Sequence, residues 1–391
     1  MKKKMVLLLS CMCIFLTGCW DKVEIDRNAF VSVIGVDVGK DIKDEEALKD
    51  VKAGEPFGER NLERLNVTFA FPDISKYTSQ NPEISSDKYV KTPSYSMEDA
   101  LSNAVSKSSR VLNLGHTDLL LISNELLQYP DNVKEIVDFL SRSPQINRTM
   151  YVAMTEGDVE EFFNFKIEME NTLGTYLTGL MESSKRNASI LPVNLNEFII
   201  LLTENGNAII PAIKIDKDKN EMLIDGIAII KGYKFIGRLS PQDTTVVEML
   251  RGKLITGKKV IYKDQVPIDL EIDNLKRKIK VVEDNGKLVF NINIDIEGRI
   301  KEYKVDKELF NDYTLEEIQN YFNNSLSEEG EKVARRVQRE YAVDIFGVRE
   351  HVRKFMPITW EKMEDNWEKA FKDAVINVNV DTKIRRIGTR K

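Results

Sequence analysis

The stretch Lys280-Val281-Val282-Glu283-Asp284-Asn285-Gly286-Lys287-Leu288-Val289-Phe290 decides the fold of the C-terminal part of this chain. Asp-Asn-Gly between two apolar runs is typical of a tight β-hairpin turn, because Asn and Gly tolerate the positive φ angles of such turns. We therefore predict two long paired strands, 267–283 and 287–303, on either side of the turn.

The apolar residues of the two arms follow different numbering. In the second arm Leu288, Phe290 and the isoleucines that follow have even numbers, so they share one face of the strand. In the first arm the apolar residues have even numbers over 268–272 but odd numbers at Ile279 and Val281. Because a slip of one residue reverses the faces of a strand, we predict a bulge or break near 274–277.

The segments after the hairpin complete this part of the fold. A long helix is predicted over 314–346, with Gly330 as the place for a bend, and a second helix begins at Pro357. A final strand follows around 376–380. We expect an antiparallel sheet that is covered by helices on one face.

Upstream of the hairpin, strand-like and helix-like segments alternate, which is typical of a layered α/β arrangement. A polar stretch over 75–93 and a charged stretch over 41–60 are expected to be irregular. The other predicted strands are 29–38, 65–71, 119–123, 148–154, 208–215, 222–231 and one that ends near 239. The other predicted helices begin at 96, 130, 157, 171, 195 and 240.

The predicted elements indicate an α+β protein of three domains. Residues 19–190 would form a mixed α/β N-terminal domain and 191–253 a small middle domain. Residues 254–391 would form the C-terminal domain, an antiparallel sheet packed with helices. The chain is longer than a typical single domain, which agrees with this division.

Residues 1–18 have the pattern of an export signal, with Lys2-Lys3-Lys4, an apolar run and the small-residue site Thr17-Gly18. The run is shorter than the roughly 20 apolar residues that a membrane span needs. Cys19 directly after the site narrows the pattern to a bacterial lipoprotein signal. We expect Cys19 to carry an S-diacylglycerol group and, after cleavage, an N-acyl group, which would tether the mature chain to membrane lipid.

Composition argues against several kinds of chemistry. Cys11 and Cys13 lie in the predicted signal, so the mature chain keeps Cys19 alone and has no internal disulfide. The formal net charge of −6 becomes more negative when the signal lysines are removed, which argues against nucleic acid as a partner. With two histidines, His116 and His351, in the whole chain, we expect no metal site and no cofactor.

Two segments come close to ligand-binding motifs. Gly252 to Lys259 nearly matches a phosphate-binding loop, but Lys259 stands where a Ser or Thr must bind magnesium. Asp216 to Glu221 begins like a calcium loop, but its sixth position lacks the glycine that the sharp bend requires. We interpret both segments as basic or solvated turns.

The remaining candidates are also explained by structure. Neither His116 nor His351 has partners in the spacing of a catalytic triad, and no nucleophile motif occurs, so we expect no enzyme activity. Trp360 and Trp367 share a helical stripe with Phe371, which indicates core packing, with a ligand-binding surface as the alternative.

A set of segments, in order along the chain, resembles the Ger(x)C lipoproteins, the C subunits of spore germinant receptors, which include GerAC-, GerBC- and GerKC-like proteins. Each segment is weak alone, and the ordered set is specific. The segments are Cys19-Trp20-Asp21 with Glu24; 115–122, Gly-His-Thr-Asp-Leu-Leu-Leu-Ile; 225–230 with Gly237-Arg238-Leu239; and 344–347 with Pro357-Ile358-Thr359-Trp360, Trp367 and the strand 375–387 with Gly388.

This resemblance implies a non-enzymatic receptor subunit that takes part in spore germination. It implies a place on the outer face of the spore inner membrane, anchored through Cys19, and assembly with two integral membrane subunits called A and B. The charged insert 41–60 fits the family pattern poorly, and we assign it no role. The alternative is an extracytoplasmic solute-binding lipoprotein of an importer, which would have two similar α/β lobes joined by hinge strands.

Overall fold

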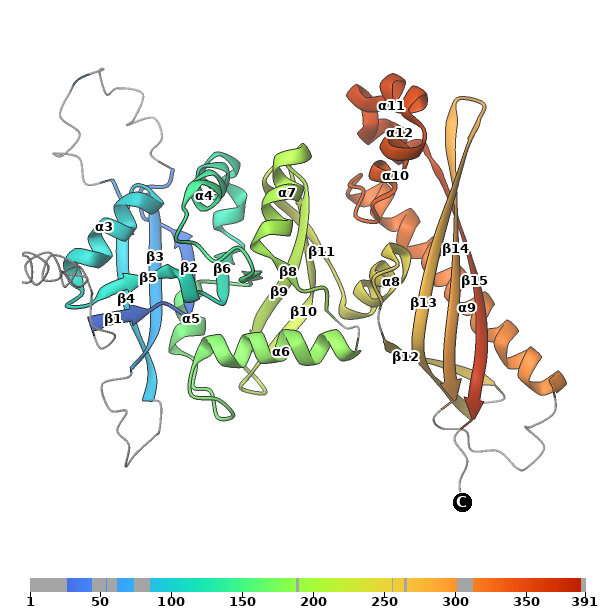
Figure 1. Ribbon diagram of the computed structural model, residues 1–391, viewed down its shortest axis with the longest axis horizontal. Helices are drawn as coiled ribbons and strands as arrows, with labels where there is room; N and C mark the ends of the chain where they lie inside the picture. Colours follow the sequence, from blue (N-terminus) through green and yellow to red (C-terminus); the bar gives the residue numbers. More distant parts are fainter. Residues whose placement is uncertain are drawn as a thin grey trace, which may run out of the picture.

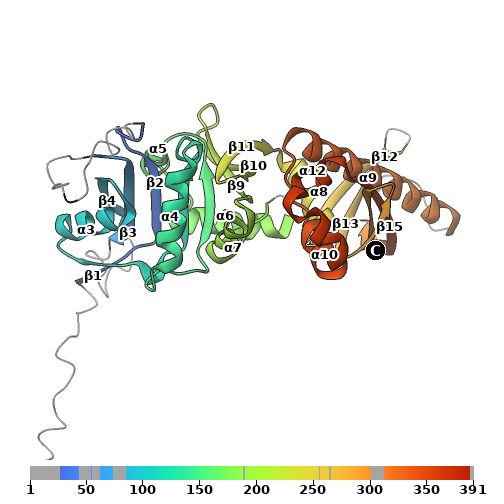
Figure 2. The ribbon, with the colours of Figure 1, turned by 90° about the horizontal axis from the view of Figure 1, so that it is seen from above.

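The computed structural model describes residues 27–43, 54, 62–73, 85–187, 190–254, 256–263, 266–300 and 312–387. In these residues the elements form two sheet-based units, and Figure 1 shows them side by side along the long axis of the molecule. The perpendicular view in Figure 2 also separates the two units. Helix α8 (Pro241–Arg251) lies where they meet.

The first unit is built on a nine-stranded mixed sheet. Its central strands β2, β6, β7 and β9 run parallel to one another, and antiparallel strands flank them. From one edge to the other the order is β11 (Lys234–Leu239), β10 (Glu221–Lys231), β9 (Ala208–Asp216), β7 (Tyr151–Thr155), β6 (Leu119–Ser123), β2 (Val33–Val38), β3 (Leu65–Asp73) and β4 (Ser85–Ser94), with β8 (Val193–Asn194) paired to β7.

Helices cover both faces of this sheet, as the buried β6 requires. Leu120 and Ile122 belong to the apolar cluster that includes α3 (Met97–Lys107), α4 (Pro130–Arg142) and α7 (Leu195–Asn205). Leu119 and Leu121 point the other way, into the cluster of α5 (Val159–Asn164) and α6 (Leu173–Asn187). A separate two-stranded pair, β1 (Asn28–Phe30) with β5 (Val111–Asn113), lies beside this unit.

Local sequence signals account for several of these elements. Ser96 caps α3, since its hydroxyl accepts a hydrogen bond from the Asp99 amide at 3.2 Å. The prediction of irregular structure over 75–93 is wrong in its second half, where β4 pairs with β3. A polar strand at the edge of a sheet needs no apolar pattern, so its sequence did not indicate it. Most of the insert 41–60 lies outside the described residues.

The strands of the middle segment do not form a sheet of their own. β9 pairs in parallel with β7 at Met154 and Thr155, so β9, β10 and β11 extend the N-terminal sheet. The expected separate middle domain is therefore joined to the first unit through backbone hydrogen bonds. The domain boundaries at 190/191 and 253/254 stay predictions.

The second unit is a four-stranded sheet in the order β12 (Gly257–Lys263), β13 (Val266–Asp284), β14 (Lys287–Ile300) and β15 (Val375–Ile387). The hairpin turn is where the sequence placed it, with φ of 50° at Asn285 and 76° at Gly286. The pairing shifts between Ile272 and Asn274, so the bulge lies at Asp273, just before the predicted stretch. The overall α+β fold class is confirmed.

One pairing in the second sheet differs from expectation. β15 runs parallel to β14, with Val289 opposite Val375, so the sheet is mixed and the prediction of an antiparallel sheet is wrong. A helical crossover causes this, because it returns the chain to the start of β14 before β15 begins. The crossover helices are α9 (Asp312–Glu340), α10 (Val348–Phe355), α11 (Pro357–Met363) and α12 (Trp367–Asp373), with the 3₁₀ turn η7 (Glu364–Asn366) between the last two.

Helix α9 is uninterrupted at Gly330, and this glycine serves close contact with β15. A Cβ added there would lie 2.8 Å from the Cγ1 of Val378, closer than packed atoms allow. The helix predicted from Pro357 is divided by η7 into α11 and α12.

Side chains of α9 close the edge of the sheet at β15. Gln319, Asn323, Ser327 and Glu331 accept hydrogen bonds from the amides of Ile384, Thr382, Val380 and Val378, at distances from 2.7 to 3.4 Å. Four helical residues rise about 6 Å and two strand residues about 6.6 Å, so every fourth side chain meets every second amide. We call this row the sealed edge.

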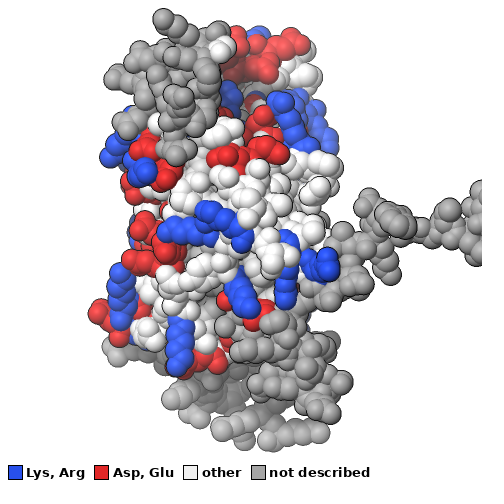
Figure 3. All heavy atoms as spheres, turned by 90° about the vertical axis from the view of Figure 1, so that its left-hand side faces the viewer, with Lys and Arg blue, Asp and Glu red and all other residues white. Residues whose placement is uncertain are grey.

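The opposite end of the molecule is formed by β4 and α3. Figure 3 shows that Lys and Arg side chains are interspersed there with Asp and Glu, around uncharged surface. Tyr89 on β4 donates to Asn164 of α5 at 2.9 Å, and Lys91 forms an ion pair with Glu160. This edge therefore has no single sign of charge.

Candidate functional site at the junction of the two sheets

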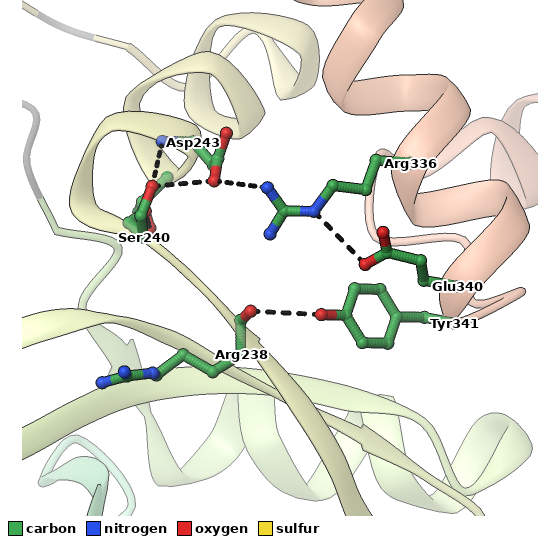
Figure 4. A network of polar contacts seen from close by, with 7 residues as sticks. Arg238, Ser240, Asp243, Arg336, Glu340 and Tyr341 are labelled. Carbon is green, nitrogen blue, oxygen red and sulfur yellow. Dashed lines mark hydrogen bonds and ion pairs between the residues drawn. The ribbon is translucent and has the colours of Figure 1, made fainter.

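The junction is held by a polar network that joins α8 to α9 (Figure 4). Ser240 caps α8, since its hydroxyl accepts from the Asp243 amide at 3.1 Å. Asp243 then accepts from Arg336 of α9 at 3.0 Å, and the same guanidinium contacts Glu340 at 3.3 Å. Asp243 and Glu340 therefore balance the positive charge of Arg336.

Tyr341, which follows Glu340 in the chain, fixes β11 against α9. The hydroxyl of Tyr341 donates to the carbonyl of Arg238 at 3.2 Å (Figure 4). A Cβ on Gly237 would lie 2.4 Å from the Tyr341 ring, so only glycine lets the ring approach β11. Lys231 of β10 adds an ion pair to Glu368 of α12 at 2.6 Å.

A half-buried arginine ties three segments together behind this contact. Arg277 of β13 donates to the carbonyls of Leu250 and Phe346, both at 2.8 Å. Burial lowers the pKa of Arg277, and the nearby Asp344 opposes that effect. Burial raises the pKa of Asp344, although its carboxylate accepts from the amides of Phe346, Gly347 and Arg349. These contacts make the junction a fixed connection.

A cavity of about 210 Å³ lies at the junction between α7, β9 and residues 343–350. Two larger cavities also lie along the junction. One, of about 440 Å³, lies between α8, β12 and α9, with an apolar floor that includes Val246, Met249 and Leu254. Its rim carries Lys259 and Arg336, which are paired with Glu329 and Asp243. The other, of about 650 Å³, lies between the β8 segment and the bulge of β13. At this second cavity, burial raises the pKa values of Glu248 and Tyr151.

A carboxyl group with a strongly shifted pKa lies elsewhere, at the end of β2. Burial raises the pKa of Asp37 to about 6, against hydrogen bonds from Ser123 and the Val159 amide that lower it. Its Oδ2 accepts from that amide at 2.6 Å. Burial at the end of β2 is therefore the main physical cause of the shift.

The two near-motifs of the sequence are structural. Gly252, with φ of 69°, ends α8, and Lys259 lies on β12 in an ion pair with Glu329. Asp216 closes a hairpin turn by accepting from the amides of Asp218 and Lys219. Within the described part of the chain, no three His, Cys, Asp or Glu side chains gather in a way that could hold a metal ion.

The two histidines lie in different units and do not meet. His116 packs edge-on against Phe30, with ring centroids 5.0 Å apart. His351 lies 4.7 Å from the ring of Phe355, and burial lowers its pKa, with Arg277 adding to that effect. Neither contacts a carboxylate and a nucleophile together.

The tryptophan stripe lies mainly in the core. The Trp360 and Trp367 rings are 5.5 Å apart, Trp360 is 6% exposed, and the guanidinium of Arg349 lies 4.8 Å above its ring. Packing between α11, α12 and β14 therefore explains this stripe.

The predicted lipidation site, Cys19, lies outside the described residues, so it stays a prediction. In the described residues, no helix is both long and apolar enough to cross a membrane.

Sequence reasoning missed the junction because its partners are far apart along the chain. Arg336 and Asp243 are separated by 93 residues, and Lys231 and Glu368 by 137. Such pairs have no local pattern. Gly237 next to Arg238 was noticed as part of a motif, but its contact with Tyr341 depends on the docking of α9.

Comparisons with known protein families match nearly the whole chain. Residues 21–215 match a family model described as "Spore germination protein N-terminal domain". Residues 225–388 match one described as "Spore germination B3/ GerAC like, C-terminal".

Individual relatives agree with these matches. Spore germination protein B3 of Bacillus subtilis (strain 168) is 23% identical, over 97% of this chain and 96% of its own. Spore germination protein A3 of the same organism is 25% identical, over 96% of each chain. The crystal structure of the GerBC protein has the same fold, with a TM-score of 0.59 and 21% identity, over 82% of this chain and 94% of its own.

Proposed function

Because this chain belongs to the GerAC-like family of spore germination proteins, the C subunits of germinant receptors, we propose that it is a lipid-anchored subunit that assembles with integral membrane A and B subunits. The observation that carries the proposal is the match of both family models, in order, over nearly the whole chain. The subunit would act by binding and not by catalysis.

The geometry of the junction supports a binding role. The charged side chains Arg336 and Asp243 are paired, and the contacts of Tyr341 with Arg238 and of Lys231 with Glu368 fix one unit against the other. A fixed body suits a subunit that holds partner surfaces at a set distance. The two units also differ in strand number and topology, which argues against the two similar lobes of a solute-binding protein.

Deletion of the gene in its own host tests the function. Spores that lack this chain should fail to germinate with the nutrients that its receptor senses, and a copy of the wild-type gene should restore germination. Normal germination of the deletion strain through that receptor would refute the proposed role.

The anchor is tested separately with Cys19→Ala. We expect an unprocessed or mislocalised precursor, because the thiol that receives the diacylglyceryl group is absent. Cys13→Ala, inside the predicted signal, is the matched control and should be processed normally. Full processing and normal membrane retention of Cys19→Ala would contradict lipidation.

A further inference from the structure

The second sheet has one edge that no described element closes. β12 pairs with β13 only from Val266 to Ile272, so the upper half of β13 has β14 on one side alone. Gly252 approaches Arg277 closely and covers the middle of the strand. Residues 279–283 lie beyond it, and we call them the open edge.

The hairpin register shows which backbone groups face outward. Asp284 pairs with Lys287 across a two-residue turn, so the amides of residues 280, 282 and 284 point to β14. The N–H and C=O groups of Ile279, Val281 and Glu283 alternate with these and point away from the sheet. Within the described residues, no backbone or side-chain group bonds these outward groups.

The side chains beside the open edge carry positive charge on one face. Lys276, Lys278 and Lys280 are exposed on the outer face of β13. Lys278 contacts Asp295 at 3.4 Å, whereas Lys276 and Lys280 form no ion pair with any described residue.

The other face beside the open edge carries the apolar Ile279 and Val281, with the exposed Glu283 at its end near the turn. Ile279 and Val281 are partly buried against the core. α10, which contacts β13, ends at Phe355, whose side chain is 62% exposed, and Ile358 just after it is 72% exposed. A strand added along residues 279–283 would meet Lys280 and the exposed Val282 on one face, with Lys278 just beyond, and Ile279 and Val281 on the other.

We propose that the open edge binds an extended segment of a membrane subunit of the same receptor, which adds as a fifth strand to β13. This rests on the proposed function. The chemistry of the segment follows from the two faces: an acidic residue lies opposite Lys280, with Lys278 as its diagonal neighbour, and apolar residues lie opposite Ile279 and Val281. Five residues, about 17 Å of strand, suffice for the contact.

A second copy of this chain fits the open edge poorly. Antiparallel pairing of residues 279–283 with the same residues of a second copy would place Glu283 opposite the half-buried Ile279 and the two Lys280 side chains at diagonal positions on one face, and like charges across strands are destabilising. The lysines therefore oppose self-association through β13 while they favour an acidic strand.

The test uses the full chain in its host, with a photo-crosslinking amino acid in place of Lys280. We expect a cross-link to an extended acidic segment of a receptor membrane subunit, identified by mass spectrometry. The matched position is Lys383 on β15, which is exposed beside the sealed edge and should give at least about tenfold less product. A cross-link to a second copy or to lipid alone, or none at all, would overturn the proposal.

Two substitutions at one position separate the backbone from the side chain. Val281→Pro lacks the outward N–H and should reduce the cross-link at least about tenfold, whereas Val281→Ala keeps it and should retain the product. Equal products from the two variants would contradict strand addition.

Charge reversal provides a test that leaves the backbone unchanged. Lys278→Glu, placed in the cross-linking chain, should repel the acidic segment and reduce the product, whereas Lys372→Glu on α12, also exposed, should not. An unchanged product with Lys278→Glu would contradict the proposed charge of the partner.

Germination separates this proposal from the function on which it rests. If the deletion strain fails to germinate while folded Val281→Pro germinates and cross-links normally, the fifth strand is refuted and the subunit role stands. If the deletion strain germinates normally, the subunit role itself fails.

Discussion

The two long edges of the C-terminal sheet differ in whether their outward backbone groups are hydrogen-bonded. At β15, four side chains of α9 bond the outward amides, so the strand offers no free donors there. At the open edge of β13, the outward groups of residues 279–283 have no partner among the described residues. A sheet with one sealed and one open edge can accept a partner strand on one side alone.

The largest expected change in stability comes from proline substitutions at two neighbouring residues of β13, whose amides point to opposite sides of the strand. Lys280→Pro removes an amide that bonds β14 and should lower the free energy of unfolding by about 3 kcal/mol. Val281→Pro removes an outward amide and should cost about 1 kcal/mol, mostly lost packing. Urea unfolding of both variants checks the assignment, and equal losses would show that the two amides do not face opposite sides.

The sealed edge is tested by removing one side chain from its row. Asn323→Ala leaves the Thr382 amide, buried at 1% exposure of its residue, without its acceptor, and should cost about 2 kcal/mol. Asn324→Ala is the matched control, because Asn324 is exposed on the same helix and should change stability by less than about 0.5 kcal/mol. Thermal or urea unfolding distinguishes them, and a similar loss in both would argue against the seal.

The fit of α9 against β15 is tested at Gly330. Gly330→Ala should lower stability by about 1–2 kcal/mol, because the new methyl group meets Val378 at 2.8 Å and strain exceeds the gain in helix propensity. In a Val378→Ala background the same change should cost at least about 1 kcal/mol less, because Cγ1 is absent and the contact with the Cβ at 3.3 Å remains. Additive effects of the two substitutions would contradict direct contact.

The smallest expected effect is the pH dependence of stability that Asp37 causes. Asp37 lies in the first sheet, so this effect should be independent of the two edges of the second sheet. The folded state holds the proton of Asp37 more tightly than the unfolded state, since its pKa is raised from 3.8 to about 6. Its contribution to stability is therefore present at pH below about 4 and is lost as the pH rises through 6.

Asp37→Asn should remove that dependence. At pH 7.5 we expect a gain of about 1 kcal/mol, less than the full shift because Asn accepts a weaker bond from the Val159 amide. At pH 4 the variant and the wild type should be nearly equal. A gain in the free energy of unfolding that is the same at both pH values would refute the role of Asp37 ionisation.

Much of the fold was predictable because its signals are local. The turn at Asn285-Gly286, the parity change before Ile279 and the cap at Ser96 each involve a few adjacent residues, and the structure has all three features. β4 was missed because an edge strand can be polar throughout. The direction of β15 was missed because a strand's own residues do not show which neighbour it joins.

The candidate site was less predictable than the fold. Arg336 looked like one of many charges on a helix, and only its position opposite Asp243 makes it part of the junction. Of the sequence-predicted sites, Cys19 alone was expected to carry chemistry, and it stays a prediction.

The sequence by itself determined the family, the α+β class and the local elements, because motif order, periodicity and turn chemistry are written in neighbouring residues. Only the tertiary structure decided which strands share a sheet, how α9 docks on β15, and which amides of β13 stay open. Those properties depend on contacts between segments that are tens to more than a hundred residues apart, such as Lys231 with Glu368. A linear pattern cannot show that Gln319, Asn323, Ser327 and Glu331 stand in for a missing strand.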